Sequence, residues 1–507
     1  MIYRKIFISI FLLIFFNLPA QELSAIIIDS LDQQPIPFVT ITSNFDKNTI
    51  TNEEGKFRLF KDESFSNFDS IYISSIGYKS LALSANRIDV FINLSPSAIE
   101  LEAVTVTNRE KLTAIQIINK VKENAKNILD FDYVKRKVFW REITMSETKR
   151  FDVKIKKSSI KEFDQKFMDS ITSTIPKKNN FYIEVLSDFY GNKNPENQKI
   201  NSLKSAELIN KETEISLKTI ENKIQPIVDL RIKPDSYFKF RSGIFPVDIE
   251  AEGVDFRSVD STDTAQLEKI NNKKLDDKKD FNSTNRNFIK KMSNSFIDYK
   301  KKELYLPYLE VFKRSRKFDF KLVGLSYLGY DPIYIIDYNP KSSKGKYKGK
   351  IYVHADDFAL IRIDYENIRM LRDFSLLGVS FKAEKRFGKR IFKKNDNGKY
   401  DLYFSENNFQ VSFGLDRPLK IIEKNKNVRG RRKQNELTMQ INFNGTTKVN
   451  TELIFIETNT LKHEDYKKYK EINSDIPFKL KEYDPNFWKG YNIVEPNEVL
   501  KEFKIEN

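Results

Sequence analysis

Short runs in which apolar and polar residues alternate dominate this sequence, and this two-residue period constrains its fold more than any other feature. Successive side chains of a β-strand point to opposite faces of the sheet, so such runs predict half-buried strands. They recur from Leu23 to Leu94 and again from Tyr133 to Ile456, with turn-forming residues between them. The sequence therefore predicts a mainly β, largely antiparallel protein with a few helices.

The first group of alternating runs predicts a domain of its own at 22–96. Its strands are short, and turns such as Asn52-Glu53-Glu54-Gly55 separate them, until Val90, Ile92 and Leu94 close the set. Seven short strands at this spacing, without a helical period, are typical of a Greek-key β-sandwich of the prealbumin or immunoglobulin type.

Four sequence elements in this stretch carry a family resemblance: Asp29, Pro35–Ile41, Thr51–Phe57 and Ile73–Tyr78. Together they resemble the carboxypeptidase-regulatory-like domain, a module of Bacteroidetes envelope proteins that often precedes TonB-dependent receptors. Asn52 stands where that family usually has Asp, and either side chain can satisfy a local turn hydrogen bond. The resemblance covers about the first hundred positions and implies an accessory module without peptidase residues.

The segment 97–132 predicts a connector. Its first part, Ile99–Thr107, resembles the strand that leads into the plug of a TonB receptor, but no plug-like sequence follows. Instead, apolar residues recur at intervals of three and four, which predicts an amphipathic helix whose apolar stripe packs on the core. These residues are Leu112, Ile115, Ile118, Val121, Ala125 and Ile128.

The remainder, 133–507, predicts a larger domain built on a curved antiparallel sheet. We expect a mobile polar insertion near 251–287 and a short strand at Leu230–Ile232. Consecutive hairpins follow, and the run Gly349–Ile363 resembles a hairpin of LolA-type half-barrels, which shield lipid-like ligands. Phe487–Ile493 also looks like large Bacteroidetes proteins that combine the same N-terminal module with such a region. The resemblance implies a half-barrel-like architecture.

The N-terminus has the pattern of a signal peptide over 1–21. Arg4 and Lys5 form a short positive region, 6–16 is almost purely apolar, and Pro19-Ala20-Gln21 supplies a cleavage region. The apolar run is too short to span a bilayer. We therefore expect an exported protein of the periplasm or the outer-membrane periphery.

Catalytic chemistry has few candidate residues in this chain. Cysteine is absent, which excludes disulfides, thiol nucleophiles and cysteine metal ligands. The two histidines, His354 and His463, lie far apart in the sequence and lack metal-ligand spacing. Ser326 and the pair Asp356-Asp357 are candidates for a hydrolase, and the alternative is that they are ordinary strand and turn residues. No catalytic, cofactor-binding or metal-binding residue is predicted.

Positive charge is the remaining functional signal. Lysines and arginines number 87 against 71 acidic residues, a formal net charge of +16. Basic clusters fall in the second half, where they predict contacts to an anionic surface or simply a solvated face of an exposed sheet. The candidate contacts are Arg386, Lys389, Arg390, Arg429, Arg431, Arg432 and Lys433.

These observations predict a non-enzymatic cell-envelope protein with a binding or scaffold role. The curved sheet would hold a lipid-like ligand or an envelope partner, without a cofactor. Anionic lipid, lipopolysaccharide or an outer-membrane protein are the expected partners, and nucleic acid is not expected because an exported protein rarely meets it. The alternatives are an envelope hydrolase and an accessory part of an outer-membrane transport assembly.

Overall fold

The computed structural model describes most of the chain from Glu22 to Lys501. The described ranges are 22–43, 48–60, 69–84, 88–97, 112–128, 131–209, 211–233, 236–243, 245–251, 278–291, 297–298, 303–304, 310–342, 345–425, 427, 429, 432–472 and 477–501. The predicted signal peptide and the predicted connector strand at 99–107 lie outside the described residues.

Two small sheets at the start of the described chain form the predicted sandwich. Their strands are β1 (Glu22–Asp29), β2 (Thr40–Ser43), β3 (Asn48–Ile50), β4 (Lys56–Phe60), β5 (Ser70–Ser74), β6 (Leu81–Ser84) and β7 (Phe91–Leu94). One sheet has the order β4-β1-β7 and the other β3-β2-β5-β6. Alternating side chains of both sheets, among them Ile27, Ile41 and Ile73, form a shared buried core. The two-residue period explains this directly, because every second side chain of each strand points inward.

Two of the sequence elements quoted above have a clear structural role. Gly55 has a φ of +70°, and a Cβ there would lie 2.6 Å from the carbonyl oxygen of Ile27. Glycine is therefore required at this turn for both its conformation and its size. The hydroxyl of Tyr78 donates to the carboxylate of Asp29 at 3.0 Å, which joins the two ends of the motif set.

A single large sheet makes up most of the rest, as the predicted fold class requires. Among the described residues it has 14 strands, eleven of them in the order β15-β16-β17-β18-β20-β21-β22-β8-β9-β10-β23. The bounds are β8 (Val134–Ser158), β9 (Lys178–Gly191), β10 (Lys199–Ile209), β11 (Ser236–Ser242), β12 (Phe245–Ala251), β15 (Phe318–Leu328), β16 (Asp331–Pro340), β17 (Tyr347–His354), β18 (Leu360–Asn367), β19 (Arg372–Leu376), β20 (Val379–Lys394), β21 (Tyr400–Asn425), β22 (Lys433–Thr460) and β23 (Phe478–Leu480).

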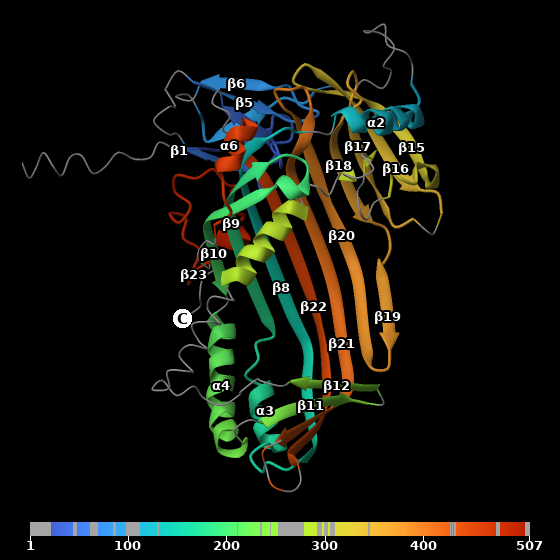
Figure 1. Cartoon of the computed structure of the whole chain (residues 1–507). Helices are drawn as coiled ribbons and strands as arrows, with labels where there is room; N and C mark the ends of the chain where they lie inside the picture. Colours follow the sequence, from blue (N-terminus) through green and yellow to red (C-terminus); the bar gives the residue numbers. More distant parts are fainter. Residues whose placement is uncertain are drawn as a thin grey trace, which may run out of the picture.

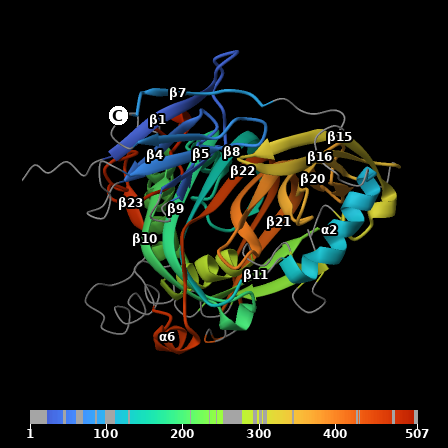
Figure 2. The ribbon, with the colours of Figure 1, turned by 90° about the horizontal axis from the view of Figure 1, so that it is seen from above.

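Four very long strands give this sheet its shape. β8, β22 and β21 run side by side from the sandwich to the far end of the molecule, and β20 accompanies them as far as Val379, opposite Leu415 (Figure 1). Register shifts interrupt the pairing of β22 with β8 at three places in the described ladder. Such bulges bend a strand and increase its twist, and the sheet is visibly curved when seen from above (Figure 2).

Helices cover parts of the sheet. They are α2 (Ala114–Ile128), α3 (Gln165–Thr172), α4 (Lys211–Arg231), the helix at 278–291, α6 (His463–Lys468) and α7 (Glu498–Lys501), with 3-10 turns at Pro195–Asn197 and Ser315–Lys317 and a small hairpin of β13 (Ile297–Asp298) and β14 (Glu303–Leu304). The predicted connector helix is confirmed as α2. Its residues Ile117, Ile118, Val121 and Ala125 are buried against the sheet.

Two local expectations were wrong. Leu230–Ile232 is not a strand, because Leu230 and Arg231 belong to the last turn of α4. A pattern of three residues is too short to distinguish the two-residue period of a strand from the 3.6-residue period of a helix. Within the expected mobile insertion at 251–287, residues 278–287 are helical, and 252–277 lie outside the described residues. The helix is held because Asn285 contacts the sheet, where it accepts from the Trp140 indole at 2.7 Å.

The two faces of the large sheet have different partners. On one face, α2 and the helix at 278–291 pack over Val138, Trp140 and Phe455. On the opposite face, the sandwich and the C-terminal segment, which contains Trp488, pack over Phe139 and Phe404. The sandwich therefore shares a core with the sheet.

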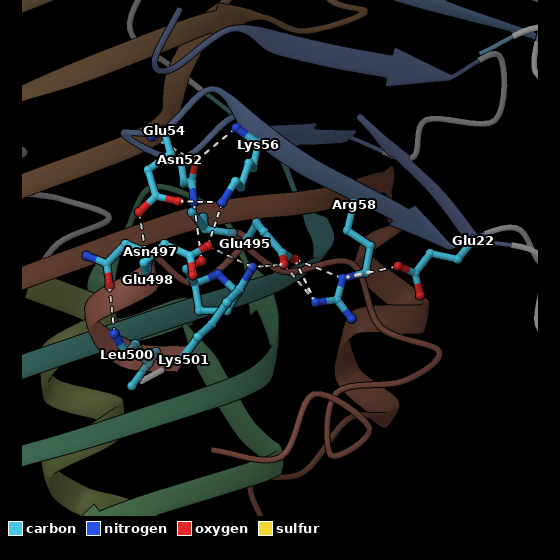
Figure 3. A network of polar contacts seen from close by, with 12 residues as sticks. Glu22, Asn52, Glu54, Lys56, Arg58, Glu495, Asn497, Glu498, Leu500 and Lys501 are labelled. Carbon is cyan, nitrogen blue, oxygen red and sulfur yellow. Dashed lines mark hydrogen bonds and ion pairs between the residues drawn. The ribbon is translucent and has the colours of Figure 1, made fainter. Parts of the chain in front are cut away.

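The C-terminal segment fastens the sandwich to the sheet through polar contacts (Figure 3). Arg58 of β4 donates to both carboxylate oxygens of Glu495, at 2.8 and 2.9 Å. The backbone N–H of Phe60 donates to the Asn492 side chain at 2.7 Å. Lys56 pairs with Glu498, so β4 is held along its whole length.

Candidate functional site

The helix-bearing face of the sheet becomes half-exposed towards the end farthest from the sandwich, and there it carries a row of phenylalanines. Phe374, Phe381 and Phe413 lie directly opposite one another on β19, β20 and β21. Phe443 of β22 continues the row, 6.1 Å from Phe413, and lies 6.0 Å from Phe151 of β8. Because they alternate with polar residues along each strand, all five side chains point to the same face.

This apolar face leads into a cavity of about 280 Å³, which we call the distal pocket. Its volume approaches the roughly 300 Å³ at which small-molecule sites begin. The segment between β8 and α3, the C-terminal end of α4 with the residue after it, β11, β21 and β22 contribute its walls. The lining residues are Ile160, Phe163, Val228, Ile232, Phe238, Phe240, Ile421, Glu423, Asn435, Glu436 and Leu437.

Two carboxylates line the distal pocket, Glu423 and Glu436. Only Glu436 has charged partners, and these are lysines. Glu436 pairs with Lys433, with Lys420 at 3.2 Å and with Lys157 at 3.4 Å. The hydrogen bond from Lys433, together with Lys420, lowers the pKa of Glu436 to about 2. Three ammonium groups thus surround one carboxylate of the distal pocket, and none of the three lysines lines the cavity itself.

The other carboxylate of the distal pocket, Glu423, has neutral hydrogen-bond partners. Its oxygens accept from the Ser236 hydroxyl at 2.6 Å and from the Asn435 amide at 2.7 Å. The backbone N–H of Lys233 adds a third hydrogen bond at 3.0 Å. Glu423 thus fixes the segment between α4 and β11 to β21 and shapes the pocket wall.

The seven predicted anionic-surface residues do not form one face. Arg386, Lys389 and Arg390 lie in the middle of β20, whereas Arg429, Arg432 and Lys433 lie at the β21–β22 connection; Arg431 is outside the described residues. In the strand register, Lys389 of β20 lies opposite Glu406 of β21, and Lys433 of β22 lies opposite Lys424 of β21. These positions are 18 residues apart on β21, which is roughly 60 Å of strand.

Their exposure differs as well. Arg390 is buried, and Lys389 forms an ion pair with Glu406 at 3.0 Å while it lies over the Phe38 ring. Arg386 is half-buried against Phe409. Burial takes Arg390 out of reach of any surface, so the exposed members are Arg429 and Arg432, with Lys433 half-exposed beside the distal pocket. For these the anionic contact stays a prediction.

The hydrolase candidates are placed around the β17–β18 turn. Ser326 of β15 and His354 of β17 are separated by β16, with Ile333 opposite both, and two strand spacings amount to roughly 10 Å. His354 Nδ1 accepts from the backbone N–H groups of Asp356 and Asp357, at 3.3 and 3.1 Å. The imidazole thus caps its own turn, and this arrangement supplies no serine–histidine pair.

A second cavity, of about 230 Å³, lies between the sandwich and the sheet, with Thr42, Lys393 and His354 among its lining residues. Lys393 donates there to Asn48 at 3.0 Å, and Lys394 pairs with Asp357 at 2.7 Å. Its cations are thus used in contacts within the chain, as are the lysines around Glu436, and its lining is less apolar than that of the distal pocket.

Metal and membrane signals were also sought in the part of the chain that the structure describes. There, no group of three or more histidine, aspartate or glutamate side chains is placed to hold a metal ion. No helix of the same residues has both the length and the apolarity needed to cross a bilayer.

The comparisons with known proteins add little to this geometry. No protein-family model and no curated protein matches the chain, so none supports the resemblance of 22–96 to the carboxypeptidase-regulatory-like domain. Among solved structures, the chain is similar to a LolA superfamily protein from Nitrosomonas europaea, at 10% identity and a TM-score of 0.16, over 71% of this chain and 99% of that one. It is also similar to MucB, solved in complex with MucA(peri), at 8% identity and a TM-score of 0.14, over 65% of this chain and 93% of that one. Likenesses this distant carry no functional argument.

Sequence reasoning found part of the site. Lys433 was visible as one of a basic cluster, but its contact with Lys157 and Lys420 around Glu436 was not, because these residues come from three different strands. The apolar walls come from segments far apart in the sequence, such as Ile160 and Val228. Only the alternation along β21 and β22 signalled that one face there is apolar.

Proposed function

We propose that this chain is a non-enzymatic protein of the cell envelope that binds an anionic amphiphile at the distal pocket. The acyl part would lie in the pocket and along the apolar face, and the acidic headgroup would lie at Lys420, Lys433 and Lys157. The observation that carries this proposal is an apolar cavity with a carboxylate in its wall, Glu436, around which three lysines gather.

The energetics favour such a ligand over a purely polar or purely apolar one. Each methylene group removed from water contributes about 0.8 kcal/mol, so about six of them contribute roughly 5 kcal/mol. A lysine near an anionic group contributes about 1 kcal/mol. Neither part alone gives more than weak binding, whereas together they give an affinity in the micromolar range.

An envelope location is part of the same proposal. It is supported by the positive, apolar and small-residue pattern at 1–21, which is typical of secretory signals. Amphiphiles with acidic headgroups are the material of envelope membranes, so location and ligand are mutually consistent.

Binding of single-chain phospholipids below their micelle concentration tests the proposal. We expect lysophosphatidylglycerol to bind about tenfold more tightly than lysophosphatidylcholine, measured by titration calorimetry. Ile421→Trp should abolish binding of both lipids because the larger side chain fills the cavity, while Leu217→Trp, at an exposed position of α4, should not. Failure of both lipids to bind the unmodified protein would refute the proposal.

The lysine rim has its own variants. Glu436→Gln removes the carboxylate that competes for the lysines, so lysophosphatidylglycerol should bind severalfold more tightly. The triple variant Lys420→Gln, Lys433→Gln, Glu436→Gln should bind it about tenfold more weakly and leave lysophosphatidylcholine unaffected. Lys448→Gln, an exposed lysine of β22, is the matched control.

A scaffold role is the second candidate, and one observation favours it. Near the sandwich, the same sheet face is filled by the chain's own α2 and helix 278–291, so only the far end is open to a ligand. If mass spectrometry of protein purified from its native envelope finds a partner protein and no amphiphile, the scaffold role is favoured.

A further inference from the structure

The hairpin formed by β19 and β20 exposes apolar side chains at the edge of the sheet. Phe374, Leu376 and Leu377 are 44%, 57% and 47% exposed. In the described ladder β19 pairs with β20 alone, so its outer side has no strand beside it. Figure 1 shows this hairpin projecting along the side of the long sheet, towards the end where β11 and β12 lie.

The tip of this hairpin, Leu377-Gly378, has an unfavourable backbone conformation at Leu377. Leu377 and Gly378 both have positive φ values, +51° and +76°. A two-residue turn of this type favours Asn or Asp at the first position, because their side chains tolerate the left-handed conformation and are hydrated. Leucine there costs about 1 kcal/mol in strain and exposes an apolar side chain as well. Strain of this kind that persists at an exposed position points to a functional role.

The tip is held firmly and lies next to the distal pocket. The backbone N–H of Asp416 donates to the Gly378 carbonyl at 2.6 Å. Arg417 donates to the Leu377 carbonyl at 3.1 Å and to the Ser242 carbonyl at 2.7 Å. Ser242 ends β11, the strand whose Phe238 and Phe240 line the pocket. One arginine therefore joins the exposed tip to the wall of the distal pocket.

The stretch of chain that begins beside the tip and runs from β21 into β22 is strongly basic, while Asp373 and Asp416 lie at the tip itself. Between 415 and 448 the sequence carries nine lysines and arginines against three acidic residues. Arg372 and Lys382 flank the tip on β19 and β20 themselves. A protein with a net positive surface here repels a second copy of itself but is attracted to an anionic bilayer.

We propose that the β19–β20 tip inserts shallowly into an anionic bilayer surface, with Phe374, Leu376 and Leu377 below the headgroups and the basic residues among them. Apolar burial and attraction to acidic lipid act together at such interfaces. The proposal goes beyond binding of an amphiphile, because it states which surface of the protein meets the membrane. It places the distal pocket beside the source of its ligand.

A single fluorescent label tests this directly, since the chain has no cysteine of its own. Leu376→Cys carrying an environment-sensitive nitrobenzoxadiazole label should shift to shorter wavelengths and brighten with vesicles of three parts phosphatidylcholine to one part phosphatidylglycerol. Phe91→Cys, labelled in the same way on the edge strand β7 of the sandwich, should not respond. An unchanged signal at 376 on vesicles that bind the protein would overturn the proposal.

Vesicle sedimentation supplies the second readout. Leu376→Ser with Leu377→Ser should partition about tenfold more weakly to the same vesicles, while Val90→Ser with Phe91→Ser should match the unmodified protein. Equal partitioning of both double variants contradicts the proposal. So does a label response at 376 that grows with protein concentration without vesicles, because a second copy or another protein strand would then cover the edge. Binding of monomeric lysophosphatidylglycerol is unaffected by the tip variants, so the two proposals can fail separately.

Discussion

A row of charged residues crosses the face of the large sheet that lies under the sandwich. Lys389, Glu406, Glu452, Arg141 and Glu184 stand directly opposite one another on β20, β21, β22, β8 and β9. Arg141 contacts Glu184 at 2.6 Å and Glu452 at 3.1 Å, and all three side chains are largely buried. Buried charges are tolerated only when they are paired, so the row is stable only as a whole.

Arg141→Met should therefore destabilise the protein strongly. The substitution leaves Glu184 and Glu452 buried without their cation, which costs about 3–5 kcal/mol. Urea unfolding measures the loss. Arg150→Met, on the same strand but in an exposed pair with Asp152, should change stability by less than about 0.5 kcal/mol. Similar losses for the two variants would mean that the buried row contributes little.

Glu452 should make stability depend on pH. Burial raises its pKa to about 7; Arg141 opposes the rise, and Glu406 and Glu53 add to it. Glu184 and Lys389 belong to the same row. In the unfolded chain the same carboxyl has its ordinary pKa, near 4.3. Between these two pKa values the folded state therefore keeps a proton that the unfolded state has lost. Stability should fall between about pH 4.5 and about pH 7, by at most about 4 kcal/mol, and then level off.

Glu452→Gln tests this directly, because an amide cannot titrate. Urea unfolding at several pH values should show the downward slope in the unmodified protein and a much flatter profile in the variant. A slope that persists unchanged in Glu452→Gln would assign the pH dependence to another group.

At the scale of single residues, the sequence predicted which positions are charged but not which charges meet. Arg141 and Glu452 lie in alternating runs where a charged residue is expected to face solvent. They are buried because the sandwich and the C-terminal segment cover that face of the sheet. Only the strand register, which no local pattern specifies, brings the five side chains into one row.

At the scale of elements, the alternating runs were located correctly but divided too often. The alternating runs Lys399–Phe404 and Asn408–Phe413 predict two separate strands, whereas residues 400–425 form one strand, β21, with the polar residues Ser405, Glu406 and Asn407 within it. A run of three polar residues is typical of a turn. Here each of them pairs with residues of β20 and β22 on both sides, so the strand continues through them.

The C-terminal segment connects β4 to the large sheet through polar contacts. A double-mutant cycle measures the coupling energy of such a contact. Arg58 and Glu495 form a bidentate, largely buried ion pair. Arg58→Met and Glu495→Gln should show a coupling energy of about 1–3 kcal/mol in urea unfolding. The more exposed pair of Lys56 with Glu498 should give less than about 1 kcal/mol. Equal couplings would show that burial does not strengthen the Arg58 contact.

At the scale of the whole molecule, the sandwich has a core of its own and also contributes to a second core that it shares with the large sheet. Phe38 and Ile50 of the sandwich belong to the same buried cluster as Phe404 and Trp488, and the rings of Phe38 and Phe404 are 5.5 Å apart. The sequence indicated the sandwich because its strands are local. The shared core depends on 487–494, more than 400 residues further on, and no local pattern reveals that contact.

This shared core predicts that the sandwich and the sheet unfold together. Amide hydrogen exchange in urea should give β1 and β8 the same midpoint, because exposing either element breaks the cluster around Trp488. Trp488 is buried, packs edge-on against Phe139 and donates to Glu184 at 2.6 Å. Trp488→Ala should therefore cost about 3–5 kcal/mol and separate the two midpoints, with β1 unfolding first. If β1 already exchanges at lower urea than β8 in the unmodified protein, the sandwich folds as an independent module, and the contacts in Figure 3 join two autonomous domains.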